Sequence, residues 1–230
     1  MRKTVLLLVC FVACAGISYG AGGSGGPMGM MYMVDLSKLN NTLAPDGIEF
    51  TDNNLLLWGG AGTNWLTDAF GVGGIGVAGF QFSEDRSAAL YMGMAGLSIQ
   101  NILIEGSISQ VTLMYGPGYT SMHLVRGTGV NKCEYAVGGM AFFAAVTLQL
   151  KVSNMTRLEI DLGGNMVSNE SWVQLKGPAA YPIPEDMNIT GVYGALILRF
   201  GGTYVPEQGG IYLPASTSSA KKILGMRGIL

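Results

Sequence analysis

The most regular alternation of apolar and polar residues lies in the second half of the chain, between Phe142 and Leu162. Around a turn at Ser153-Asn154, apolar residues recur at alternate positions, and a period of two places them on one face of a strand. The pattern predicts an antiparallel hairpin with one apolar and one charged face. The polar face carries Thr147, Gln149, Lys151, Arg157, Glu159 and Asp161, and the apolar face carries Phe142, Val146, Leu148, Leu150, Leu158, Ile160 and Leu162.

A second hairpin is predicted from Leu55 to Phe82, where glycine-rich apolar runs lie on both sides of a polar hinge at Thr63, Asn64 and Asp68. An interior glycine costs a helix about 1 kcal/mol relative to alanine. A sheet instead uses glycine to bend or to let another backbone approach. The protein is therefore expected to be all-β.

The other predicted elements are shorter. Asp35 is a candidate N-cap for a helical turn or two at 35–43. Gly116-Pro117-Gly118 is expected to turn the chain, and 169–188 predicts a long loop, functional or mobile, with Trp172, Tyr181, Pro182 and Pro184. Further strands are expected at 28–34, 88–99, 107–115, 119–125 and 192–205.

These elements predict a single β domain over 28–205, built from antiparallel glycine-rich hairpins of about eight strands. Either a barrel or a two-layer β structure accommodates them. A helix within the C-terminal tail, 206–230, is an open alternative. So is an internal duplication that would relate the segment from Asn64 to the segment from Asn154.

The N-terminus has the pattern of a secretory signal peptide over residues 1–20. Basic Arg2 and Lys3 precede an apolar run that is too short for a spanning helix, and small residues occupy 18 and 20. A lipobox ending at Cys14 is the alternative, and it would leave a lipid-anchored protein. After cleavage at Gly20, residues 21–27 are expected to form a flexible leader.

Composition narrows the functional classes. Removing Arg2 and Lys3 with the signal leaves 11 of the 13 basic residues against 15 acidic ones, a formal charge of −4, which argues against nucleic-acid binding. Cys133 would be the only remaining cysteine, so no intrachain disulfide is expected. The chain is 49% hydrophobic and only 12% charged, so lipid or partners are expected to cover its surface, or its sheets to pack on both faces.

Motifs for cofactors and metals have structural interpretations. Gly71-Val-Gly73-Gly-Ile-Gly76 fits the dinucleotide pattern, but a strand follows it where the motif needs a helix, which favours glycine packing in a sheet. Met28, Met30, Met31 and Met33 could supply thioethers to Cu(I), but neighbouring positions of a strand face opposite sides. We therefore expect no cofactor and no metal.

Catalytic constellations are also weak. His123 and Cys133 lack an orienting third residue, and the single histidine has no nucleophile-elbow serine as a partner. Glu159 and Asp161 share a strand face at a separation compatible with glycoside hydrolysis, but charged neighbours favour a solvated or lumenal face. Catalytic residues are therefore predicted to be absent. Four N-x-S/T triplets, at Asn40, Asn154, Asn169 and Asn188, are interpreted as turn residues.

With its two hairpins, short turns and a final strand ending in Arg199-Phe200, the chain resembles small bacterial outer-membrane β-barrel proteins over about 28–205. The resemblance implies an apolar outer band, a polar interior and aromatic girdles. Two features depart from it: about 25 residues follow the last strand, and the strands at 69–99 are apolar on both faces. The expected girdle residues are Trp58, Trp65, Tyr91, Tyr115, Tyr193 and Tyr204.

The sequence therefore predicts an exported, non-catalytic cell-envelope β protein, of the outer-membrane-barrel kind. Its expected partners are outer-membrane lipid or other copies of itself. A soluble, self-assembling β module is the first alternative, in the periplasm or outside the cell, with the charged face of the late hairpin exposed to water. A ligand-binding protein or hydrolase is the second.

Overall fold

The protein is a closed antiparallel β-barrel. The computed structural model describes residues 23–67, 69–127, 132–168, 171–178 and 187–201, together with the backbone of 210–211. The strands are β1 (Gly23–Met33), β2 (Asn54–Trp65), β3 (Phe70–Phe82), β4 (Ala88–Glu105), β5 (Ser109–Arg126), β6 (Cys133–Lys151), β7 (Thr156–Val167), β8 (Val173–Lys176), β9 (Gly191–Phe200) and β10 (Gly210–Ile211).

Eight of these strands, β1 to β7 and β9, form the barrel wall. Each pairs with its neighbour in sequence, and β9 pairs with both β7 and β1, which closes the ring. β8 adds to the end of β6 that β7 leaves uncovered, and β10 adds to the end of β4. The predicted all-β fold of about eight strands is confirmed as a barrel.

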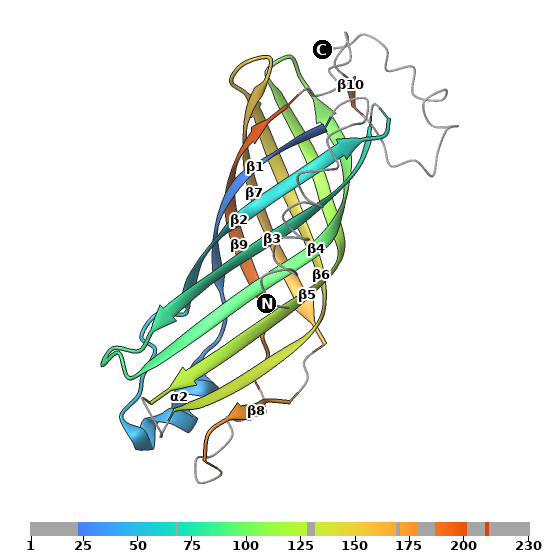
Figure 1. The fold of residues 1–230 in the computed structure, drawn as a ribbon. Coiled ribbons are helices and arrows are strands. Elements are labelled where there is room, and N and C mark those ends of the chain that lie inside the picture. The colour runs from blue at the N-terminus through green and yellow to red at the C-terminus, as the bar shows by residue number, and fades with distance from the viewer. Residues whose placement is uncertain are drawn as a thin grey trace, which may run out of the picture.

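The two ends of the barrel differ (Figure 1). At one end, three short turns join β2 to β3, β4 to β5 and β6 to β7. The other end carries α2 (Ser37–Leu43), η1 (Ala44–Asp46) and β8, which lie in the two longest connections of the wall. We call these the short-turn end and the α2 end. Lipid-inserted barrels have the same asymmetry of connections.

The barrel interior at the α2 end is filled with apolar side chains. Met30, Leu57 and Leu90 from the wall are fully buried. Leu39 and Phe50 join the same core from the connection between β1 and β2 that contains α2, which we call the α2 segment. Asn40 fixes that segment, because its amide donates to the carbonyl of Phe50 and accepts from its N–H, both at 2.9 Å. The α2 segment therefore closes this end of the lumen with a hydrophobic plug.

One predicted turn is wrong. Gly116-Pro117-Gly118 lies inside β5, an 18-residue strand that continues straight through it. The β4–β5 register passes directly from Gly96–Gly118 to Ile99–Tyr115, so Pro117, which lacks an N–H, lies where this ladder is interrupted. Glycine is needed here for packing against the fully buried ring of Phe143. A Cβ on Gly96 of β4 would collide with this ring, and Gly118 of β5 lies against it.

Several predicted boundaries also shift. β1 begins at Gly23, inside the expected flexible leader, and the helix begins at Ser37 rather than Asp35. The Asp35 carboxylate still accepts a hydrogen bond from the Ser37 N–H at 2.9 Å, and this bond lowers the pKa of Asp35 below its usual value. The expected long loop contains β8, and the expected C-terminal tail contains β10. The signal peptide, Asp68, the loop residues from Tyr181 to Pro184, and the alternative C-terminal helix lie outside the described residues.

A matched pair of glycine substitutions on β4 tests the packing against Phe143. Gly96→Ala should lower the free energy of unfolding by about 1–3 kcal/mol, because the new methyl group overlaps the ring and the neighbouring backbone. Gly93→Ala is the control, since its methyl group would meet nothing closer than 3.9 Å, and it should change stability by less than about 0.5 kcal/mol. Urea titrations in detergent micelles, followed by tryptophan fluorescence, measure both. Equal losses would contradict the packing role.

Candidate functional site

The two faces of the barrel wall differ in charge. Charged residues of the eight wall strands face the lumen with one exception, Glu134. The outer face instead carries exposed apolar side chains along each strand, for example Leu162 at 67% exposure and Leu196 at 53%. The inward-facing charged residues are Glu105, Arg126, Lys151, Arg157, Glu159, Asp161 and Arg199.

The polar half of the lumen lies at the short-turn end, and its centre is an ion pair between Arg199 of β9 and Glu159 of β7. Both side chains are buried, at 1% and 0% exposure. The guanidinium is bidentate: Nη2 donates to Glu159 Oε1 at 2.7 Å, and Nε donates to Oε2. Nη1 also donates to the hydroxyl of Thr63 on β2 at 3.2 Å. Arg199 therefore links three strands across the interior.

Asp161 lies beside this pair and is fully buried. Thr147 faces it in the β6–β7 register. Among the described residues, neither oxygen of the Asp161 carboxylate has a hydrogen bond of ordinary geometry. The nearby guanidinium of Arg199 offsets the charge of two carboxylates, so this cluster depends on one arginine.

A β-bulge directs a third acidic residue inward. The β4–β5 register shifts between Ile102 and Ile104, which pairs Glu105 with the inward-facing Gln110. A bulge of this kind re-aims the side chains beyond it. As a result, an acidic side chain lines the lumen mouth at the short-turn end rather than the apolar outer face.

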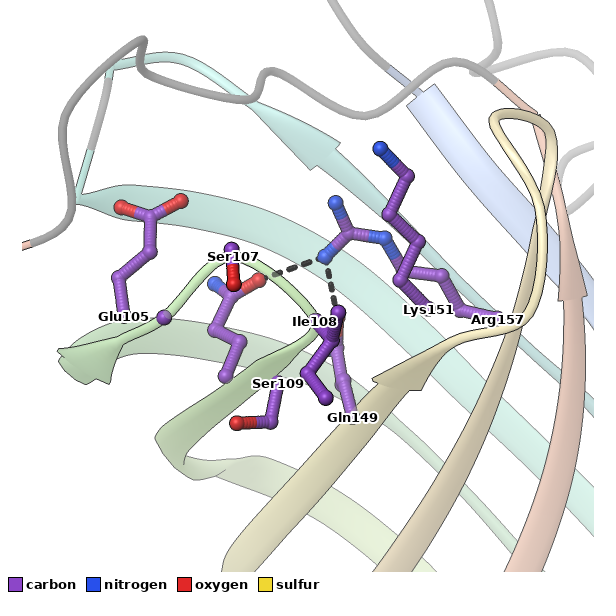
Figure 2. Close-up of a pocket in the computed structure, with 9 residues that line it drawn as sticks. Glu105, Ser107, Ile108, Ser109, Gln149, Lys151 and Arg157 are labelled. Atoms are coloured by element: carbon purple, nitrogen blue, oxygen red, sulfur yellow. Dashed lines mark hydrogen bonds between the residues drawn. The ribbon is translucent and has the colours of Figure 1, made fainter.

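That mouth contains a small pocket (Figure 2). Arg157 Nη1 donates to Gln110 Oε1 at 2.7 Å and to Gln149 Oε1 at 3.4 Å, and Arg157 is only 8% exposed. Lys151 lies next to Arg157, and Glu105 lies on the opposite side of the pocket (Figure 2). Arg157, Gln110 and Gln149 therefore form a hydrogen-bonded polar network at the mouth.

The expected aromatic girdle is partly wrong. Trp58 and Tyr91 do face outward, at 65% and 42% exposure. Trp65 and Tyr193 face the lumen instead, with only 4% and 2% of their surfaces exposed. In β2 and β9 the odd-numbered residues point inward, and both aromatic residues have odd numbers. Tyr115 faces outward and accepts a hydrogen bond from Asn101. Tyr204 lies outside the described residues.

The candidate catalytic residues do not meet in one pocket. His123 faces outward on β5, whereas Cys133 is fully buried at the α2 end of β6. Glu159 and Asp161 lie in the lumen towards the short-turn end, but Arg199 occupies the space beside them. Gly71 to Gly76 lie within β3, as expected for sheet glycines. Met28 and Met30 face inward, and Met31 and Met33 face outward.

Within the described residues, no three His, Cys, Asp or Glu side chains come together as a metal site. None of the helices described has the length and apolarity to cross a membrane.

Comparisons with solved structures give matches of low sequence identity. A major outer membrane protein from Thermus thermophilus matches with a TM-score of 0.49 and 9% identity, over 79% of this chain and 99% of that one. Ail, the attachment invasion locus protein of Yersinia pestis, matches with a TM-score of 0.42 and 12% identity, over 78% and 95%. The outer membrane protease OmpT from Escherichia coli gives 0.36 and 11%, over 80% and 97%.

No protein-family model and no curated protein sequence matches the chain. The classification therefore rests on the geometry of the barrel wall. A closed eight-stranded barrel with an apolar outer face and inward charges is an outer-membrane-type β-barrel. The expected resemblance to this class is confirmed.

Removing the lumenal arginine should expose the dependence of the cluster on it. Arg199→Met leaves Glu159 and Asp161 buried together without their cation and should lower the free energy of unfolding by about 3–5 kcal/mol. The double variant Arg199→Met, Glu159→Leu should lose less than the sum of the two single variants, because it removes the ion pair as a unit. Urea titrations in micelles measure the coupling. Strictly additive losses would contradict a direct interaction.

Proposed function

We propose that the protein is an integral, non-catalytic protein of a bacterial outer membrane, with its barrel inserted in the bilayer. The observation that carries the proposal is the distribution of charge on the wall. Seven charged side chains face the lumen, and Glu134 is the one charged residue of the described wall strands that faces outward. A soluble barrel would need the opposite distribution, because water would cover the outer face.

The asymmetry of the ends supports one orientation. Outer-membrane barrels have short turns on the periplasmic side and longer connections outside the cell. By this rule, the short-turn end faces the periplasm and the α2 end faces outward. The row of Phe80, Tyr91 and His123, which are register partners across β3, β4 and β5, then lies at the outer interface, where aromatic side chains are enriched.

The lumen supports an envelope role rather than free diffusion of solutes. The plug of the α2 segment fills one half, and the Arg199 and Arg157 networks fill the other. Eight strands enclose a space just wide enough for side chains. The outward-facing His123 and the lumenal carboxylates lie on opposite sides of the wall, which favours a non-catalytic role.

The soluble β module is the weaker candidate. It required the charged face of the late hairpin to face water, but Glu159 and Asp161 are both at 0% exposure inside the lumen. That expectation was wrong, because Glu159 pairs with Arg199 inside the lumen, and Arg157 donates there to Gln110 and Gln149. Self-association of the inserted barrel remains compatible with the proposal.

Fractionation tests the location directly. The chain would be expressed with its N-terminal residues in a diderm host, and the soluble, inner-membrane and outer-membrane fractions run boiled and unboiled. We expect recovery in the outer membrane and faster migration without boiling, because a closed barrel resists unfolding by detergent. Recovery in the periplasm or medium without a mobility shift would contradict insertion.

A charge on the outer face tests which surface contacts lipid. Leu162→Lys places a lysine near the middle of β7, where a lipid-facing position should cost about 2–4 kcal/mol and reduce the inserted fraction. Met155→Lys is the matched control, because Met155 is equally exposed, 68% against 67%, but lies in a turn. Folding into vesicles, scored by the heat-dependent shift, measures both. An unaffected Leu162→Lys variant would contradict a lipid-facing wall.

A further inference from the structure

The outer wall has a hollow near the α2 end. Its volume is about 440 Å³, and its floor is formed by the small residues Ala78 and Gly79 of β3. All the side chains that surround it face outward from β2, β3 and β4. Apart from the tyrosine hydroxyl, these side chains are apolar. The hollow is lined by Leu56, Trp58, Ala78, Gly79, Phe80 and Tyr91.

Packing holds the aromatic walls of the hollow in place. On one side, Trp58 lies over Gly29 of β1, where a Cβ would approach the indole within 3.1 Å. On the other side, the rings of Phe80 and Tyr91 have centroids 5.9 Å apart, and Phe82 packs edge-on against Phe80 at 5.3 Å. Such pairs prefer defined geometries. The hollow is therefore formed without a ligand.

Positive charge lies directly beside this aromatic wall. The Tyr91 ring is 6.1 Å from that of His123 on β5, and His123 Nε2 is 3.7 Å from Glu134 Oε2. Lys132 Nζ lies 2.7 Å from the other oxygen of Glu134, and Lys176 of β8 is the register partner of Glu134. Two lysines and a histidine thus surround one carboxylate, so the two lysine charges exceed the single carboxylate charge within this group of residues.

We propose that the hollow binds an acyl chain of a phosphate-bearing lipid from the surrounding leaflet, with the phosphate held by Lys132 and His123. The proposal rests on insertion in the bilayer as proposed above. The cationic groups lie one to two strands from the hollow, about 5–10 Å, which is within the span of a lipid headgroup. A free phosphate would leave the apolar hollow unexplained, and an uncharged lipid would leave the cationic cluster unexplained.

Quenching of Trp58 fluorescence by brominated lipids tests this site. Trp58 is the outward-facing tryptophan, whereas Trp65 and Trp172 are each 4% exposed and face the interior, so a Trp58→Phe sample supplies the background. The folded protein would be placed in phosphatidylcholine vesicles with 10 mol% of either brominated phosphatidylglycerol or brominated phosphatidylcholine. One cation near the headgroup should enrich the anionic lipid at Trp58 by about fivefold.

Matched variants separate the hollow from its cationic rim. Ala78→Met fills the floor and should abolish the preference, whereas Ala144→Met, at an outward position of β6, should preserve it. Lys132→Gln with His123→Gln should reduce the preference to that of phosphatidylcholine while leaving quenching itself intact. Each variant keeps the apolar outer face, and the heat-dependent shift confirms its insertion.

The outcomes are distinct. Equal quenching by both lipids in the wild-type protein, or an unchanged preference in Ala78→Met, would overturn the lipid site. Cross-linking of two copies through the Trp58 face, with no quenching by either lipid, would also overturn the lipid site, because a second copy would then cover the hollow. Absence of quenching without cross-linking, together with no heat-dependent shift, would instead overturn insertion itself.

Discussion

Closure of the sheet is the constraint on which the rest of the structure depends. Once β9 pairs with both β7 and β1, the wall has no open edge along its main length, and every wall residue faces either the lumen or the outside. With the barrel inserted as proposed, a charge on the outer side would contact lipid. The bulge before Glu105 follows this division, because the ladder shifts where an acidic side chain would otherwise point outward, and Glu134 is the one charged residue of the described wall strands that does face outward.

The inward charges require partners, and most of these lie in the polar half of the lumen, whereas Arg126 at the α2 end pairs with Asp46 of η1 at 2.9 Å. Arg199 joins Glu159 and Thr63 across three strands, and Arg157 joins Gln110 and Gln149 at the mouth. The other half is apolar and is closed by the α2 segment. The wall thus encloses a hydrophobic plug at the α2 end and a polar network at the short-turn end.

Much of this fold could be predicted from the alternation in the chain. The hairpins at 55–82 and 142–162 were located correctly because one face of each differs chemically from the other. Gly116-Pro117-Gly118 was misjudged because local turn propensity does not reveal that Phe143, 25 residues away, needs glycine opposite it. Trp65 and Tyr193 were placed in a girdle because position near a strand end does not determine the face. β8 and β10 are too short for their pattern to be detected.

The location of the charges could be predicted less well than their periodicity. The hairpin pattern separated Glu159 and Asp161 from Ile160 and Leu162, but it left open whether lumen or solvent received the carboxylates. Arg199, the partner that decides this, lies 40 residues from Glu159. The hollow at Trp58 likewise combines residues from three strands, which no local pattern brings together.

Thiol labelling at consecutive positions of β9 tests the central claim, that the outer face contacts lipid and the inner face is sealed. Single cysteines at Leu196 and Leu198, both outward, and at Ile197, inward and fully buried, would be introduced with Cys133 replaced by alanine. In vesicles, a charged water-soluble thiol reagent should react at none of the three positions, because the thiolate that reacts does not form in apolar surroundings, and all three should react once the protein is unfolded in urea. Ready reaction of 196 and 198 with the charged reagent would place the outer face in water and contradict the account.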